Sequence, residues 1–138
     1  MHKGFLKTGA LLAALAVILG AFAAHALRDL VSERAVATFE TAVRYQFYHA
    51  FALIITGMLY QNFRFKSILW SGYFFIAGII LFSGSLYCMA IVQGMVQPGY
   101  KWLGPLTPFG GLCFIIGWVL LCVSFFRHKE VTSFSGKV

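Results

Sequence analysis

Four long runs of uncharged, mostly apolar residues make up most of the chain, with short polar segments between them. They cover residues 8–27, 45–63, 67–100 and 102–126, and none contains Asp, Glu, Lys or Arg. A bilayer's hydrocarbon core is about 30 Å thick and a helix rises about 1.5 Å per residue, so roughly 20 such residues cross it once. The third run is too long for one crossing and its tail carries Gly94, Pro98 and Gly99, so we expect its helix to end near Val92. The pattern predicts a single all-α membrane domain over residues 1–138, with four transmembrane helices at about 8–27, 45–63, 67–92 and 108–126.

The segment before the second span has the pattern of an amphipathic helix that continues into that span. Ser32 is placed to cap the helix, and Glu33 suits its positive N-terminus. Apolar and charged side chains then fall on separate faces: Val36, Phe39, Val43 and Phe47 on one, Glu33, Glu40 and Arg44 on the other. Glu40 and Arg44 are four residues apart and are expected to form a surface pair, although Arg44 could also reach the headgroups.

Other local signals concern helix ends and helix packing. Thr107 and Pro108 resemble an N-cap and first helical residue, so we expect the fourth helix to begin there. Tyr100 and Trp102 at one end, and Trp70 and Tyr73 at the other, suit the aromatic belts of a membrane protein. Small residues are expected to allow close helix packing, and we assign this role to Ala16, Gly20, Ala24, Gly84, Gly110 and Gly111.

Composition and charge agree with a membrane chain and indicate its orientation. The 138 residues are 60% hydrophobic and 11% charged, which leaves too little polar surface for a water-soluble globule. The net charge of +7 lies in the connections and not on one basic face, so nucleic acid is not an expected partner. Seven Lys and Arg residues fall on the side of the termini and four on the other side, which predicts cytoplasmic termini while leaving the reverse orientation open.

The N-terminus and the cysteines each have a second interpretation. Lys3 and Lys7 before an apolar run that ends at Ala24-His25-Ala26 resemble a signal peptide, but we expect a retained helix. The three cysteines, Cys88, Cys113 and Cys122, have no metal-ligand spacing and are expected to pack in the apolar core.

Polar residues within the predicted spans gather in the half of the bundle away from the termini. We expect them to face inward, because an unpaired polar group in hydrocarbon costs several kcal/mol. The predicted cluster contains His25, Arg44, Tyr45, Gln46, His49, Ser83, Ser85, Tyr87 and Thr107, and the other half has almost nothing comparable. Three interpretations remain open: hydrogen bonds that fix the helix register, a small binding site open to the outside, or a metal or haem held between His25 and His49.

Other chemistry is less supported. No Asp or Glu lies within a span, which counts against a coupled transporter built around a buried acid. Ser83 and Ser85 have no base and acid at suggestive spacing, and no phosphate-binding loop is present. We therefore expect no enzyme, no cofactor and no metal.

Four motifs in order resemble a known family. They are residues 20–27 (GAFAAHAL), 41–50 (TAVRYQFYHA), 81–87 (LFSGSLY) and 107–111 (TPFGG), with Gly117-Trp118 beyond. They are similar to the YgdD/YwdK-like family of small membrane proteins of unknown function. The resemblance implies a four-helix protein of the bacterial inner membrane and brings no catalytic residue.

The leading hypothesis is a non-enzymatic interaction or accessory module with a polar cluster in its outer half. Membrane lipid, another membrane protein or a second copy are the expected partners. The alternatives are a small-solute carrier or channel that uses His25 and His49, and binding of a metal or haem by the same pair.

Overall fold

The computed structural model describes residues 1–94 and 104–135, with side chains described at 1–93 and 104–126. Over these residues the chain forms helices and no strand, which confirms the predicted all-α membrane bundle. The tail of the third run, with Tyr100, Lys101 and Trp102, lies outside the described residues, as do the side chains of the basic residues after Phe126. The elements are α1 (Lys3–His25), η1 (Leu27–Asp29), α2 (Glu33–Leu59), α3 (Lys66–Gly78), η2 (Ile79–Ser83), α4 (Gly84–Gly94) and α5 (Leu106–Ser135).

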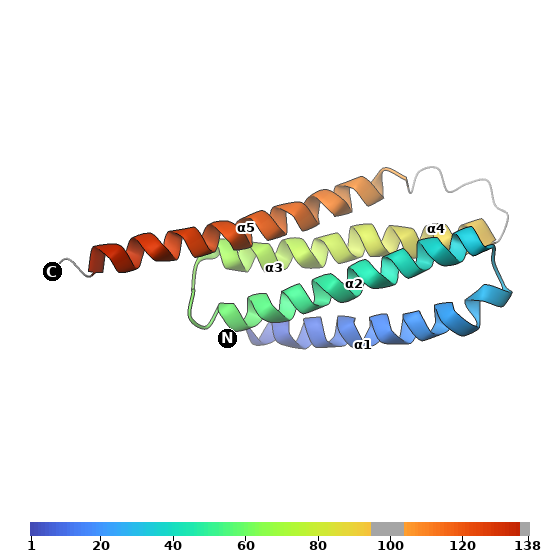
Figure 1. Ribbon diagram of the computed structural model, residues 1–138, viewed down its shortest axis with the longest axis horizontal. Coiled ribbons are helices and arrows are strands. Elements are labelled where there is room, and N and C mark those ends of the chain that lie inside the picture. Colours follow the sequence, from blue (N-terminus) through green and yellow to red (C-terminus); the bar gives the residue numbers. More distant parts are fainter. Residues whose placement is uncertain (95–103, 136–138) are drawn as a thin grey trace.

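The elements form four rods that run side by side in the order α1, α2, α3–α4 and α5 (Figure 1). Segments α3, η2 and α4 follow one another without a break and form the third rod. The start of α1 and the end of α5 lie at the same end of the bundle (Figure 1). We call this the inner end, and the opposite end, which carries η1 and the start of α2, the outer end.

Three of the rods are long and apolar enough to cross a membrane: Lys3–Asp29, Lys66–Gln93 and Leu106–Phe126. Rod α2 is not among them because Arg44, Gln46 and His49 lower its hydropathy. It packs against α1 and against the third rod along its length. Large apolar side chains on α1 and α5 point outward, among them Ile18 and Phe109, each about two-thirds exposed at 65% and 63%. Such a surface suits a lipid environment.

Local sequence explains how α1 and α2 begin. The Ser32 side chain accepts a hydrogen bond from the Ala35 amide at 3.4 Å, and α2 then runs unbroken from Glu33 to Leu59, as the amphipathic pattern predicts. At the start of α1, His2 Nδ1 accepts from the Phe5 amide at 3.2 Å, while the His2 amide donates to the Gly57 carbonyl at 2.9 Å. The first residues are therefore attached to α2.

The start of α5 differs from the prediction. The helix begins at Leu106, one residue before the expected cap, Thr107. The Thr107 hydroxyl pairs with Ser85 on α4 at 2.8 Å. The sequence pattern could not anticipate this partner, because Ser85 is 22 positions away in the chain.

Small residues on α1 let α2 approach closely, with one correction to the predicted stripe. Ala16 is buried and Gly20 is half-buried against Val43, but Ala24 is exposed and Ala23 is buried instead. Eight residues along a helix overshoot two turns by about 80°, whereas seven residues fall short by only about 20°. The packing face of α1 therefore passes through Ala16 and Ala23.

The predicted glycine contacts on the other rods are partly right. A Cβ at Gly110 would overlap the backbone of Phe82, so α5 and η2 pack tightly there, and a Cβ at Gly111 would make ordinary contact with the Phe82 ring at 3.8 Å. A Cβ at Gly84 would meet nothing within 4 Å, so this glycine does not mark a close approach within the described structure. Gly9 on α1 and Gly117 on α5 were not predicted, and a Cβ at either would lie 2.7 Å from its nearest neighbour, Ile54 or Phe75.

Segment η2 is a short π-helix in the middle of the third rod. Before it, α3 packs against α5 and α2; after it, α4 packs mainly against α2. A π-helix adds a residue to a turn and so rotates the side chains beyond it relative to those before it. The change in packing partner along the third rod coincides with this segment.

Candidate functional site

Gln46 joins three rods near the middle of the bundle. Its side chain is 3% exposed, and Nε2 donates to the Leu12 carbonyl on α1 at 2.9 Å. Its Oε1 accepts from the Tyr87 hydroxyl on α4 at the same distance. Both ends of the amide are thus bonded to other helices, which fixes α2 relative to α1 and α4.

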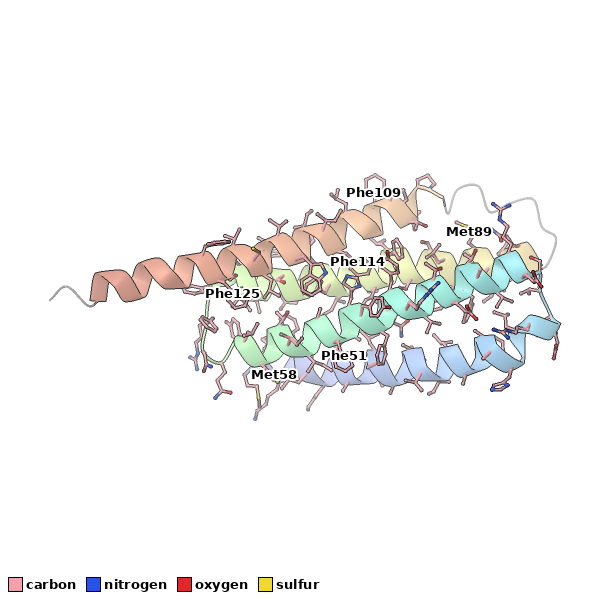
Figure 2. All side chains as sticks on the ribbon, in the orientation of Figure 1. Phe51, Met58, Met89, Phe109, Phe114 and Phe125 are labelled. Carbon is pink, nitrogen blue, oxygen red and sulfur yellow. The ribbon has the colours of Figure 1, made fainter. Side chains whose placement is uncertain are left out.

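His49 lies one turn further toward the inner end and connects α2 with α5. Its ring is 6% exposed and stacks on Phe114, with centroids 3.4 Å apart and an interplanar angle of 11°. Figure 2 shows Phe114 directed from α5 toward the neighbouring rods, whereas Phe109 points away from the bundle. Nδ1 lies 2.8 Å from the Tyr45 carbonyl, and Nε2 accepts from the Trp118 indole at 3.2 Å. Because a carbonyl only accepts and an indole only donates, these bonds fit the neutral ring with its proton on Nδ1.

Ser85 and Thr107 connect α4 with α5 near the outer end. Their hydroxyl oxygens are 2.8 Å apart, and Ser85 also donates to the Phe82 carbonyl at 2.9 Å. Ser83, within η2, is 0% exposed, and its hydroxyl has no hydrogen-bond partner among the described residues. The structure therefore pairs two of the predicted hydroxyls and leaves Ser83 separate.

Polar bonds also occur toward the inner end, so the expectation that this half has almost nothing comparable is wrong. Ser67 on α3 and Ser124 on α5 are 2.7 Å apart at their hydroxyls, and Ser71 donates to the Gly117 carbonyl at 2.8 Å. Thr56 bonds within its own helix to the Ala52 carbonyl. Small hydroxyls give only a weak signal in an apolar sequence. Inside the membrane domain, however, each of these bonds a neighbouring helix or a backbone carbonyl.

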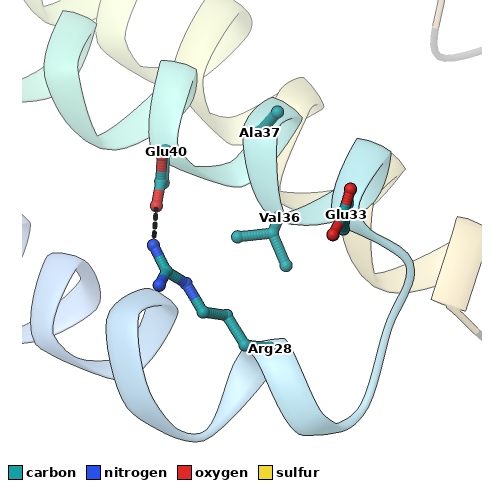
Figure 3. Close-up of a pocket in the computed structure, with 5 residues that line it drawn as sticks. All are labelled: Arg28, Glu33, Val36, Ala37 and Glu40. Atoms are coloured by element: carbon teal, nitrogen blue, oxygen red, sulfur yellow. Dashed lines mark hydrogen bonds and ion pairs between the residues drawn. The ribbon is translucent and has the colours of Figure 1, made fainter.

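The outer end carries a charged pocket between η1 and α2 (Figure 3). It has a volume of about 370 Å³ and is lined by Arg28, Glu33, Val36, Ala37 and Glu40. Arg28 Nη2 lies 3.4 Å from Glu40 Oε1, and both side chains are well exposed. The predicted pair of Glu40 with Arg44 is therefore wrong: the fold brings Arg28 to Glu40 from twelve positions away, and Arg44 instead donates to the Thr41 hydroxyl at 3.2 Å.

His25 and His49 do not come together. The bond from Gln46 to Leu12 places this part of α2 beside the middle of α1, and His25 lies thirteen residues beyond Leu12, about 20 Å along the helix. His25 is exposed, whereas His49 faces Phe114 and Trp118. The expected common depth is wrong, so no metal or haem can bridge this pair. The described side chains contain no group of three or more His, Cys, Asp or Glu that could hold a metal ion.

The remaining predicted residues occupy surfaces of different kinds. Tyr45 is 40% exposed, although its ring contacts Phe82 with centroids 4.6 Å apart. Cys88 and Cys122 are exposed and Cys113 is half-buried, so the expected core packing of cysteines is wrong for the first two. An apolar thiol is equally compatible with the lipid-facing surface of a membrane protein.

Sequence reasoning missed Trp118 as a partner of His49. Trp118 lies near the middle of the predicted fourth span, away from the interfaces where tryptophan is usual. An indole N–H in that position needs an acceptor, and this signal could have identified the contact. The outer pocket was also missed, because Glu33 was assigned to the start and charged face of α2, and Arg28 was counted only among the charges of the connections.

Comparisons with known proteins agree with the membrane architecture. The family described as "Protein of unknown function (DUF423)" matches residues 19–111. A UPF0382 membrane protein of Staphylococcus aureus (strain bovine RF122) is 42% identical over 125 residues, covering 91% of this chain and 97% of the relative. The UPF0382 membrane protein YwdK of Bacillus subtilis (strain 168) is 37% identical over 127 residues, covering 91% and 98%. No solved structure matches the chain. The motifs, the helical membrane fold and these relatives together establish that the chain belongs to the DUF423 family and is related to the UPF0382 membrane proteins, YwdK among them, as the sequence motifs predict.

Proposed function

We propose that this protein is a non-enzymatic interaction module of the bacterial inner membrane, which binds a partner membrane protein or a second copy of itself through its outer pocket. The observation that carries the proposal is that buried polar groups and exposed charged groups make different kinds of contact. Gln46, His49 and Ser85 bond other helices inside the bundle, whereas charged side chains line an open pocket at the outer end. A surface with both signs of charge offers complementarity to a partner and adds specificity to the contact.

The proposed topology has four crossings with both termini in the cytoplasm. The charge bias of the connections supports this orientation. The packing supports a crossing by α2, because a rod held between α1 and the third rod can carry Gln46 and His49 while both side chains are paired. The outer pocket would then face the periplasm.

A solute carrier has less support from the same geometry. His25, Gln46, His49 and Tyr87 were the candidate contacts for a solute. His25 is exposed and lies apart from the others, and the other three each use polar atoms to bond a neighbouring helix. Binding a solute there would require breaking these bonds. An enzyme also has little support, since the buried polar groups of the described residues bond helix neighbours separately and do not converge as nucleophile, base and acid.

Photo-crosslinking in intact cells tests the proposal. A photoreactive amino acid replaces Ala37, which is exposed and lines the pocket, and a matched probe replaces Ile115, which is 61% exposed on α5. We expect a discrete protein adduct from position 37, weakened by Glu33→Gln, and only lipid adducts from position 115. Identical adduct patterns from both positions would contradict the proposed surface. So would an adduct from position 37 whose yield is the same with and without Glu33→Gln.

A further inference from the structure

A second hollow lies on the side of the bundle, in the groove between α1 and α2. It has a volume of about 290 Å³, and its lining residues are Ala16, Val17, Gly20, Val43, Arg44, Phe47 and Tyr48. Ala16 and Gly20 contribute little or no side chain to its wall, and Gly20 faces Val43 on α2. Its exposed lining is entirely apolar, so it suits a hydrocarbon chain in polarity.

Arg44 is the cation beside this groove. The side chain is exposed, and its described bond goes to a neutral group, the Thr41 hydroxyl, at 3.2 Å. Glu40, the carboxylate nearest in sequence, pairs with Arg28. Thr41 is one turn closer to the outer end, so the guanidinium is directed toward that end of the groove, and its charge has no carboxylate partner within the described structure.

The depth of Arg44 makes this charge unusual. A Cβ on Gly20 would lie 3.4 Å from Val43, which places Arg44 at the level of Gly20. The charge-free run of α1 continues for seven more residues to Leu27, a rise of about 10 Å. The Arg44 backbone therefore lies well inside the outer end of the apolar zone, where an exposed cation requires an anion or a path to the headgroups.

We infer that this groove binds one anionic phospholipid from the leaflet at the outer end. The lipid phosphate accepts hydrogen bonds from the Arg44 guanidinium, which presents several N–H donors in one plane and suits paired bonds to phosphate oxygens. One acyl chain lies over Gly20 and Ala16 and runs past Phe47 toward the inner end. The lipid supplies both the negative charge and the apolar filling that the groove lacks.

Two other occupants fit less well. In a symmetric pair of copies the same patch meets itself, which would bring two Arg44 side chains together. A helix from another protein would need an acidic residue within its own span, and such residues are rare in membranes. A phospholipid carries its phosphate at the headgroup and its acyl chains below it. This order matches Arg44 toward the outer end of the groove and the apolar lining further in.

This site lies on the side of the bundle and is separate from the outer pocket of the proposed function. Arg44, Gly20 and Val43 do not line that pocket, and Arg28 and Glu33 do not line the groove. The inference therefore neither requires nor weakens the proposed partner surface. A failed lipid experiment with a successful crosslink at position 37 would remove only the lipid site, and the opposite result would remove only the partner surface.

Native mass spectrometry of the intact chain tests the headgroup contact. The purified protein is mixed in detergent with equal amounts of phosphatidylglycerol and phosphatidylcholine that carry the same acyl chains, and the retained lipid is counted. We expect wild type to retain phosphatidylglycerol about tenfold more than phosphatidylcholine, because the choline ammonium of the second lipid already neutralises its phosphate and weakens the charge-assisted contact with Arg44. Arg44→Gln should reduce this ratio to near one, while Arg34→Gln, an equal charge change at an exposed arginine outside the groove, should leave it unchanged.

A second pair of variants tests the chain position. Val17→Trp fills the groove from an exposed position, and Val119→Trp makes the same change on the exposed face of α5. We expect only Val17→Trp to lower the retention of phosphatidylglycerol. Equal retention by wild type and Arg44→Gln would overturn the inference, as would equal loss with Arg34→Gln, which indicates general charge attraction. In a chain whose Cys88, Cys113 and Cys122 are replaced by Ser, a disulfide between two Val17→Cys copies formed in native membranes would assign the groove to a second copy and overturn the inference as well.

Discussion

The indole N–H of Trp118 on α5 donates a hydrogen bond to Nε2 of His49 on α2, at 3.2 Å. Among the described residues it is the polar link between α5 and α2, which otherwise meet through rings such as Phe114. Because His49 also bonds the Tyr45 carbonyl through Nδ1, both ring nitrogens have partners, and the imidazole acts as a fixed connector between two helices.

Trp118→Phe should therefore weaken the bundle. The variant keeps an aromatic ring but leaves His49 Nε2 without a donor, so we expect a loss of about 1 kcal/mol in the free energy of unfolding. Trp70→Phe is the matched control, since Trp70 is 57% exposed and only ring contacts are described for it. Unfolding in mixed micelles measures both variants, and equal stability of the two would contradict the proposed importance of the bond.

The bond between Tyr87 and Gln46 gives a second prediction. Tyr87→Phe removes the donor to Gln46 Oε1, and Gln46→Leu removes the acceptor together with the link to Leu12. In a double-mutant cycle we expect a coupling energy of about 0.6–1.7 kcal/mol, between the average and the largest value found for polar pairs between membrane helices. Additive effects would show that the pair does not contribute as a unit. Tyr73→Phe, at an exposed tyrosine on α3, should have little effect.

Two glycines offer a matched test of close packing. Gly110→Ala places a methyl group against the Phe82 backbone, which cannot move away cheaply, so we expect a loss of about 1–3 kcal/mol. Gly84→Ala meets open space and improves helix propensity, so stability should stay the same or rise by up to about 1 kcal/mol. Thermal unfolding in detergent compares them, and a larger loss at Gly84 would contradict the described packing of α5 on η2.

The ion pair at the outer end should matter little for folding. Arg28 and Glu40 are 61% and 41% exposed, so Arg28→Gln should lower the free energy of unfolding by less than about 1 kcal/mol. The effect should shrink further at high salt, because screening weakens the wild-type pair. Unfolding at low and high ionic strength measures this. A loss of several kcal/mol that persists in salt would mean that the pair belongs to the structural core and not to an exposed pocket.

The chain's helices follow from its sequence because their signals are local. Ser32 and Glu33 mark the start of α2, and the apolar positions from Val36 onward continue one face into the membrane domain. Long uncharged runs likewise identify α1, the third rod and α5. Each of these inferences uses residues a few positions apart, which is the range over which helix geometry is fixed.

The partners of polar side chains could be predicted only in part, because they depend on register between rods. Gln46 and Tyr87 were expected in one cluster and do bond, but His25 was expected near His49 and lies far from it. A shift of a few residues between antiparallel helices moves a side chain by a whole turn, and hydropathy does not determine that shift. The close contacts at Gly9 and Ala23 fix it, and these small residues differ little in sequence from neighbours that face lipid.

The π-helical turn at Ile79–Ser83 divides the third rod into two halves whose packing faces point in different directions. One additional residue in a helix rotates all side chains beyond it by about 100° around the helix axis, while the axis keeps its direction. Substitutions can therefore change the contact between α3 and α5 on one side of the π-helical turn, while α4 keeps its alignment on α2 on the other side. Deleting a single residue here would join α3 and α4 in one continuous α-helix. The contact of α3 with α5 and that of α4 with α2 could then no longer both be kept.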